Sequence, residues 1–292
     1  MYDCIIIGAG PAGLTSALYL RRANKKVLLL DSKGYGGQII NASKIENYPS
    51  IKLISGFEFA TNLYNQVIDL GAEAKIETVL KIEDDKTVIT NNNNYKTKSI
   101  IIANGVQNRK LNLPNENKLL GKGISYCATC DGNFFKNKIV AVNGGGNTAI
   151  EDAIYLSSIA TKVYLIHRRD EFKAEQKYID EIKKIPNVEI ITNSNITSIN
   201  GDIKLESITL NNNKNIDVDG LFIAIGQIPN NNIFNNIVDI DEYGYIISNN
   251  EVNTKTNGIF VAGDTRQKEL RQIVTATSDG AIAASSVIKY LS

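Results

Sequence analysis

Two closely spaced cysteines and an aspartate are the residues of this 292-residue chain whose types and spacing point most directly to chemistry. Cys127 and Cys130 are separated by two residues, and Asp131 follows the second cysteine. Exchange between a dithiol and a disulfide needs a thiolate that attacks and an acid that protonates the leaving sulfur. Because the single histidine belongs to another motif, Asp131 is the candidate acid, a role compatible with capping a turn or helix.

Zinc binding and a structural disulfide are the alternatives for this cysteine pair. A structural zinc site needs four ligands, whereas the chain has three cysteines and one histidine, and Cys4 is expected in the core of the first strand. We therefore expect no metal. The chain opens directly with that strand and shows no signal peptide, which predicts a reducing cytoplasm where structural disulfides are rare. Cys127 and Cys130 are thus predicted to be a redox pair.

The cysteine pair lies between two glycine-rich turns of the kind that bind dinucleotides. Each turn follows an expected strand, at 2–7 and 138–142, and precedes an expected helix, at 13–22 and 148–158. In such a βαβ unit, small residues let the backbone approach a pyrophosphate, and the helix N-terminus favours its negative charge. Two purely structural turns are the alternative. The first motif supplies Gly8, Gly10, Pro11, Ala12 and Gly13, and the second supplies Gly144, Gly146, Asn147, Thr148 and Ala149.

The two units differ where the adenosine ribose is expected to lie. Position 23 after the first glycine is Asp31 in one unit and His167 in the other, where Arg168 and Arg169 follow. A carboxylate there accepts hydrogen bonds from a free 2′-hydroxyl, whereas arginines pair with a 2′-phosphate. The first unit is therefore predicted to bind FAD or NAD and the second NADPH. A solvated strand end is the alternative for the three basic residues.

FAD is favoured over NAD in the first unit by the C-terminal part of the chain. An expected strand at 258–262 leads to Gly263 and Asp264, and this acid is suited to binding hydroxyls of a ribityl chain. Arg271 and Gln272 precede an expected helix at 274–291, whose N-terminus would stabilise negative charge on a reduced flavin. Two further loops are expected either to line the same cavity or to be simple turns; they contain Gly36, Gly37, Gln38 and Asn47.

The length and composition suit a protein of two domains, and the two expected βαβ units make its fold class α/β. With 43% hydrophobic and 22% charged residues, the chain has enough apolar residues for substantial cores. The net charge of +1 gives no electrostatic reason to expect nucleic acid or membrane binding. Because the two halves of the flavin site come from opposite ends of the chain, we expect the second Rossmann-like domain to be inserted into the first. The predicted bounds are 1–112 with 244–292 for the FAD domain and 113–243 for the NADPH domain, with linkers near 111–117 and 238–244.

Over essentially its full length the sequence resembles the low-molecular-weight bacterial thioredoxin reductases. The motifs that carry the resemblance are GAGPAG at the start, Gly36-Gly37-Gln38, Glu46-Asn47-Tyr48-Pro49, Cys-Ala-Thr-Cys-Asp-Gly, Gly-Gly-Gly-Asn-Thr-Ala, His-Arg-Arg and Ala-Gly-Asp followed by Arg271-Gln272. The resemblance implies a homodimeric FAD enzyme that passes electrons from NADPH to thioredoxin. It also implies that Cys130 faces the flavin, that Cys127 attacks thioredoxin, that Asp131 is the acid–base group, and that the inserted domain rotates between half-reactions.

The sequence departs from the family pattern at three places. The usual Ala-Thr-Gly turn of the flavin domain is Ala103-Asn104-Gly105, so Ala103 and Gly105 are assigned to the FAD site. Asn143 replaces an apolar residue before the second glycine motif, and Lys173 replaces an arginine after His-Arg-Arg. Three other functions remain as alternatives. They are a reductase fed by ferredoxin or another donor, the flavoprotein of a peroxide-reducing system, and a flavin-binding protein with an idle dithiol.

Overall fold

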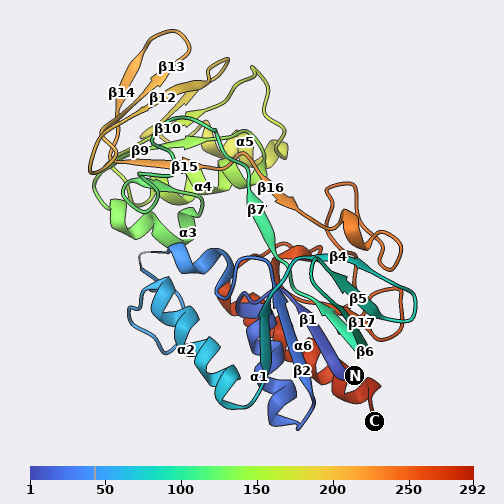
Figure 1. Cartoon of the computed structure of the whole chain (residues 1–292). Coiled ribbons are helices and arrows are strands. Elements are labelled where there is room, and N and C mark those ends of the chain that lie inside the picture. The colour runs from blue at the N-terminus through green and yellow to red at the C-terminus, as the bar shows by residue number, and fades with distance from the viewer. Residues whose placement is uncertain (43) are drawn as a thin grey trace. The chain divides into compact units, whose positions relative to one another are not determined.

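The computed structural model describes residues 1–42 and 44–292, which form two compact units. Unit 1 consists of Met1–Gln107 together with Ile228–Ser292, and unit 2 consists of Asn108–Gln227. Unit 2 is therefore inserted into unit 1, as predicted. Both units contain a largely parallel sheet with helices, so the predicted α/β class with two Rossmann-like domains is confirmed (Figure 1).

Unit 1 is built on a sheet whose central strands are parallel. Its strands are β1 (Tyr2–Ile7), β2 (Val27–Asp31), β3 (Glu73–Ile76), β4 (Val79–Ile82), β5 (Thr87–Thr90), β6 (Asn94–Ile102) and β17 (Ile259–Val261). Its helices are α1 (Pro11–Arg22), α2 (Gly56–Asp69) and α6 (Ile273–Tyr290), with 3₁₀ turns η1 (Gly37–Asn41), η3 (Asn232–Phe234) and η4 (Gly263–Thr265). In the described part of the chain, the order is β3-β2-β1-β6-β5-β4, and β17 also pairs with β6. The pairs β4–β5 and β5–β6 are antiparallel, and the pairs β1–β2, β1–β6, β2–β3 and β6–β17 are parallel.

Both faces of this sheet are buried, which explains the unbroken apolar sequence of its central strands. Cys4 and Ile6 of β1 point to one face, where they pack with α1 and α6. Ile5 and Ile7 point to the other face, where they pack with β4, β5 and the segment 234–246. Cys4 is fully buried, so its predicted place in the core is confirmed.

Helices α1 and α6 approach each other closely at Gly280. A Cβ atom at this position would lie 2.3 Å from the carbonyl oxygen of Ala12, and Ser16 Oγ donates a hydrogen bond of 3.0 Å to the Gly280 carbonyl. Glycine at position 280 therefore lets the two helices pack in backbone contact. It also places the end of the chain against the helix that follows the first glycine-rich turn.

We expect Gly280→Ala to destabilise unit 1 by about 1–3 kcal/mol, the usual cost of overpacking a tight contact. In an ordinary helix interior the same change stabilises by about 1 kcal/mol, so the sign of the effect reports the close approach. Thermal unfolding followed by circular dichroism measures it. Ser285→Ala, at an exposed position of the same helix, is the matched control. An unchanged or higher melting temperature for Gly280→Ala would contradict the contact.

Unit 2 repeats the parallel α/β arrangement on a smaller scale. Its strands are β8 (Ile124–Ser125), β9 (Ile139–Asn143), β10 (Lys162–Ile166), β11 (Val188–Ile191), β12 (Ile196–Asn200), β13 (Ser207–Leu210), β14 (Asn215–Asp217) and β15 (Gly220–Ile223). Its helices are α3 (Ala128–Asp131), α4 (Asn147–Ser157) and α5 (Gln176–Ile182), with the 3₁₀ turn η2 (Gly132–Phe135). The parallel sheet has the order β11-β10-β9-β15-β8. Side chains of α4 and α5 pack on one face, and those of the antiparallel sheet β12-β13-β14 pack on the other.

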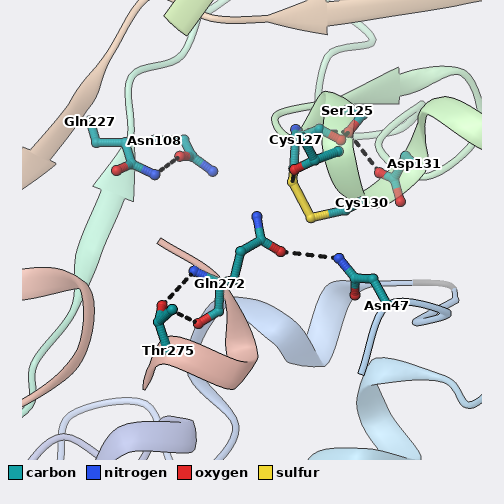
Figure 2. Close-up of a disulfide and its surroundings, with 10 residues drawn as sticks. Asn47, Asn108, Ser125, Cys127, Cys130, Asp131, Gln227, Gln272 and Thr275 are labelled. Atoms are coloured by element: carbon teal, nitrogen blue, oxygen red, sulfur yellow. Dashed lines mark hydrogen bonds between the residues drawn. A yellow bond between two sulfur atoms is a disulfide. The ribbon is translucent and has the colours of Figure 1, made fainter. Parts of the chain in front are cut away.

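The chain passes between the units along a short two-stranded ribbon, not along the predicted linkers. The ribbon pairs β7 (Val106–Asn108) with β16 (Gln227–Pro229), and Gln227 Nε2 donates a 3.1 Å hydrogen bond to Asn108 Oδ1 (Figure 2). The divisions at 107/108 and 227/228 replace the expected bounds of 112/113 and 243/244. The bounds differ from those expected because of how the flanking segments pack. Side chains of 111–113 contact the core of unit 2, and side chains of 234–238 are buried in the core of unit 1.

The remaining element bounds lie within one or two residues of those expected from sequence. The largest difference is at α1, which starts at Pro11 instead of residue 13, because a proline is favoured in the first helical turn. In the described ranges 1–42 and 44–292, no helix combines the length and apolar character needed to cross a membrane.

Candidate redox and nucleotide sites

Cys127 and Cys130 form a disulfide in unit 2 (Figure 2). Cys127 precedes the single turn of α3, and Cys130 and Asp131 lie within that turn. Gly132 then brings the chain against α4, because a Cβ atom there would lie 2.8 Å from the Tyr155 ring. The two sulfurs and the acid predicted from sequence are therefore together on one short element.

Asp131 is half-buried and is held by a serine that the sequence motifs did not point to. Ser125 Oγ donates a hydrogen bond of 2.6 Å to Asp131 Oδ2 (Figure 2). Burial raises the pKa of Asp131 above its ordinary value, and the hydrogen bond from Ser125 opposes that rise. A carboxyl with a raised pKa keeps its proton at a pH closer to neutral, as the acid that protonates a leaving sulfur must.

A second hydrogen-bonded group fixes the residue before the disulfide. The Tyr126 hydroxyl donates a 2.7 Å hydrogen bond to Glu116 Oε1, and the backbone N–H groups of Leu111 and Asn112 donate to the same carboxylate at 3.0 and 2.8 Å. Burial, together with the Glu116 carboxylate, raises the pKa of Tyr126 so that it stays protonated at neutral pH. The start of unit 2 and the segment entering the disulfide are thus tied to one buried carboxylate.

The first glycine-rich turn joins β1 to α1 and requires glycine for steric reasons. Gly8 has φ of +107°, and a Cβ atom there would lie 2.2 Å from the carbonyl oxygen of Ala103. A Cβ atom at Gly13 would lie 1.9 Å from the carbonyl oxygen of Gly8. These contacts leave no room for a side chain, so the backbone itself forms the surface of the turn. Ala103, which the sequence assigned to the same site, is therefore in direct contact with this turn.

Three other predicted segments of the first site, those that contain Gly37, Ala103 and Gly263, lie against this turn. A Cβ atom at Gly37 would lie 3.2 Å from Gly10 Cα, and one at Gly263 would lie 2.8 Å from Ala12 Cβ. Gly105 has φ of +63°, and a Cβ atom there would meet nothing within 4 Å. Close glycines beside open space form a backbone cradle of the kind that accommodates a pyrophosphate.

Two acidic residues border the same cradle. Asp31 Oδ2 accepts a 2.9 Å hydrogen bond from the Ala9 N–H, and Asp31 Oδ1 accepts one of 2.8 Å from the Lys33 N–H. Asp264 Oδ1 is buried and has no hydrogen-bond partner among the described residues, although Lys268 Nζ lies 3.6 Å away. Burial raises the pKa of Asp264. A buried acceptor without a hydrogen bond fits a ligand that supplies hydroxyl groups, as a ribityl chain does.

The other predicted residues of the first site are connected within unit 1. Asn47 Nδ2 donates a 3.0 Å hydrogen bond to Gln272 Oε1, and Gln272 begins α6 through a capping box with Thr275 (Figure 2). The Arg271 guanidinium stacks over the Tyr245 ring at 4.1 Å and donates to the Asp264 carbonyl at 3.3 Å. Gln38 Nε2 donates a 2.7 Å hydrogen bond to the Val106 carbonyl.

The second glycine-rich turn joins β9 to α4 and has the same design. A Cβ atom at Gly144 would lie 2.3 Å from the carbonyl oxygen of Ala224 and 2.6 Å from Ala149 Cβ. One at Gly146 would meet nothing within 4 Å, and Thr148 is exposed. The side chain of Asn147 is held by Glu175, whose N–H donates to Asn147 Oδ1 at 2.8 Å. This turn therefore also presents bare backbone to open space at the start of a helix.

The three basic residues after β10 have different surroundings. His167 is buried, stacks on Phe172 and packs against Gly145, where a Cβ atom would lie 2.2 Å from the imidazole ring. Burial lowers the pKa of His167, and the two neighbouring arginines lower it further, so the ring is neutral at pH 7. Arg168 and Arg169 are exposed and form no salt bridge with any described residue. The arginines are thus available to an anion, whereas His167 shapes the turn.

Comparisons with known proteins agree with this geometry. A model of the family described as pyridine nucleotide-disulphide oxidoreductase matches residues 2–280. The chain belongs to that family. The thioredoxin reductase of Listeria innocua is 42% identical over 300 residues, covering 100% of this chain and 94% of that protein. The thioredoxin reductase of Bacillus subtilis is 40% identical, covering 100% and 95%. The crystal structure of thioredoxin reductase from Streptococcus pyogenes has a TM-score of 0.95 and 40% identity, covering 100% and 98%.

The family membership confirms the resemblance found from the sequence motifs. The chain is an oxidoreductase with a redox disulfide, and its family implies a flavin and a nicotinamide cofactor. The glycine cradles of the two units are compatible with two such dinucleotides.

Proposed function

We propose that this enzyme reduces the disulfide of a thioredoxin with electrons from NADPH, which pass through FAD and the Cys127–Cys130 disulfide. The observation that carries the proposal is this disulfide beside the half-buried carboxyl of Asp131, in a chain about 40% identical to thioredoxin reductases over its full length. The balanced reaction is NADPH plus H⁺ plus thioredoxin disulfide giving NADP⁺ plus thioredoxin dithiol. Bound flavin would take two electrons from the nicotinamide and deliver them to the enzyme disulfide.

Unit 1 is proposed to hold FAD and unit 2 NADPH. In unit 1 the backbone cradle would bind the pyrophosphate, Asp31 the ribose, and Asp264 the hydroxyls of the ribityl chain. In unit 2 the turn before α4 would bind the other pyrophosphate, and the two exposed arginines the 2′-phosphate. The remaining residues proposed for the FAD site are Gly36, Gln38, Asn47, Gly105, Arg271 and Gln272.

The thiols and the carboxyl have distinct proposed roles in transfer to thioredoxin. Once the enzyme disulfide has been reduced, Cys127 attacks one sulfur of the thioredoxin disulfide, and a mixed disulfide forms while the second thioredoxin sulfur leaves. The leaving sulfur takes a proton from Asp131. Cys130 then attacks Cys127, which releases the thioredoxin dithiol and restores the enzyme disulfide. Asp131 regains its proton from Cys130 as that thiol becomes the attacking thiolate, and the second thioredoxin sulfur takes up the proton that Cys127 released to solvent before its own attack.

Because one disulfide must exchange electrons with a bound cofactor and then with a protein, we propose that unit 2 rotates between the two half-reactions. Both crossings between the units lie in the β7–β16 ribbon, so motion about this ribbon needs no other segment of chain to unfold. We also propose that the enzyme is a cytoplasmic homodimer, as the family resemblance implies. Sedimentation of the FAD-loaded enzyme tests the dimer, and a monomer at micromolar concentration would contradict it.

Steady-state oxidation of NADPH in the presence of purified bacterial thioredoxin tests the proposed activity. We expect turnover that depends on thioredoxin and yields one thioredoxin dithiol for each NADPH. If NADPH fails to reduce the bound flavin but a reduced ferredoxin succeeds, NADPH is not the electron donor and that part of the proposal is wrong. If the flavin is reduced but no electrons reach thioredoxin, the chain is the flavoprotein of another system or carries an idle dithiol.

We expect the double change Arg168→Ala and Arg169→Ala to raise the apparent KM for NADPH by about 10²-fold. Two charge-assisted contacts with the 2′-phosphate, at about 1.5–3 kcal/mol each, account for a loss of at least this size. The KM for NADH, which lacks the phosphate, should change little. The double change Lys183→Ala and Lys184→Ala removes the same charge from exposed positions of unit 2 and is the control. A double arginine variant that keeps its preference for NADPH would show that these side chains only solvate a strand end.

A further inference from the structure

Ser125 is the last residue of β8, and it connects the two functional groups of the redox segment. Its hydroxyl donates to Asp131 Oδ2 at 2.6 Å and accepts a 3.0 Å hydrogen bond from the Cys127 N–H (Figure 2). The side chain is 4% exposed, and its backbone pairs in parallel register with Phe222 in β15. A buried serine on a strand of the central sheet is therefore a rigid support for two groups on the less regular segment that follows.

We propose that Ser125 is a positioning residue that holds the Asp131 carboxyl in place and sets its affinity for a proton. The inference rests on the proposed function, in which Asp131 protonates a leaving sulfur. The roles proposed for Cys127 and Cys130 do not depend on this inference about Ser125.

The elements packed around Asp131 supply no positive charge that could stabilise its ionised form, which leaves the hydroxyl of Ser125. Helix α3 packs against η2 and α4, and none of these three elements contains a lysine, arginine or histidine. Their other acidic residues are Glu151 and Asp152 in α4, which cannot stabilise a neighbouring carboxylate. Tyr126, before the disulfide, is engaged with Glu116. In the described structure, the hydroxyl of Ser125 is thus the group that stabilises the ionised form of Asp131, while burial favours the protonated form.

The sign of the effect follows from the direction of this hydrogen bond. A hydroxyl that donates to a carboxylate stabilises the ionised form, so its removal must raise the pKa of the carboxyl. A charge-assisted hydrogen bond of ordinary strength corresponds to a shift of about one pH unit or more. Loss of the bond also frees the Asp131 side chain to rotate away from the disulfide.

The test is a titration of Asp131 in the oxidised, FAD-loaded enzyme by ¹³C NMR of labelled aspartate carboxyls, with Asp131→Asn identifying the signal. We expect Ser125→Ala to raise the pKa of Asp131 by about one unit and Ser125→Thr, which keeps the hydroxyl, to restore it. Ser125→Gly is a second variant without a hydroxyl and must shift the titration in the same direction. The acid–base limb of the pH–turnover profile with thioredoxin should move with the NMR titration.

Three results would overturn the inference: an Asp131 pKa unchanged or lowered in Ser125→Ala, one unchanged or lowered in Ser125→Gly, or a threonine variant that titrates like the alanine variant. The titration requires neither NADPH nor thioredoxin. A wild-type enzyme that does not reduce thioredoxin would therefore refute the proposed function and leave the titration decisive for Ser125. A wild-type enzyme that reduces thioredoxin, with an unshifted titration in Ser125→Ala, would refute only the role of Ser125.

Discussion

Replacing either Cys127 or Cys130 by serine is expected to reduce thioredoxin turnover to the background rate. A serine hydroxyl is not ionised at neutral pH and cannot form the enzyme disulfide, so no covalent route to thioredoxin remains. NADPH-dependent reduction of ferricyanide, which needs no thiol, should persist in both variants. The measurement is steady-state NADPH oxidation with each acceptor in turn.

Cys4→Ala is the control for these two variants, because Cys4 is buried in the core of unit 1 and lies outside the disulfide. It should retain turnover with both acceptors. If either serine variant still reduces thioredoxin at an appreciable fraction of the wild-type rate, electrons leave the enzyme by a route that does not need the disulfide, and the proposed function is wrong.

Asp131→Asn is expected to slow thioredoxin reduction by about 10³-fold, within the usual range for loss of a general acid or base. Asparagine keeps the size of the side chain and still accepts a hydrogen bond from Ser125, but it has no proton to give to a leaving sulfur. FAD content, NADPH affinity and ferricyanide reduction should stay near the wild-type values. Rapid mixing of NADPH-reduced enzyme with oxidised thioredoxin isolates the affected half-reaction.

The matched control is Asp152→Asn, because Asp152 is also a partly buried carboxyl of unit 2 and burial raises its pKa to about 7. Asp152 lies in α4, outside the redox motif, and should be replaceable with little change in rate. Equal losses in the two variants would mean that removing a carboxyl from this unit, and not the role of Asp131, causes the effect. Full turnover of Asp131→Asn would leave Asp131 as a structural residue of α3.

The features predicted well from sequence are those that depend on local sterics. Gly8, Gly13 and Gly144 face carbonyl oxygens so closely that no other residue fits, and this constraint produces a recognisable spacing between a strand and a helix. The apolar strands beside them are buried on both faces, which produces unbroken apolar runs. Two nested Rossmann-like units could therefore be derived before any contact was known.

The features that escaped prediction depend on contacts that have no periodic pattern. Ser125 meets Asp131 only because β8 leads directly into the disulfide turn, and a serine six residues before an aspartate carries no signal. The segment 234–238 was expected in the NADPH domain, yet Phe234, Ile237 and Val238 fill the core of unit 1. The true crossing at β7 and β16 is an ordinary pair of short strands, which composition does not distinguish from other strands.

Synthesis of this chain begins with unit 1, but unit 2 is the first unit to be synthesised completely. Unit 2 is a continuous segment that ends at Gln227, so it has all of its strands while the last part of unit 1 is still being synthesised. Until Ile259–Val261 emerge, Ile100–Ile102 of β6 pair with β1 on one edge but have no partner on the other, and α1 lacks α6. A nascent chain at this stage exposes an apolar strand edge and an apolar helix face, both of which promote association with other chains. We therefore expect the first hundred residues to require protection by chaperones during translation, although the finished enzyme does not.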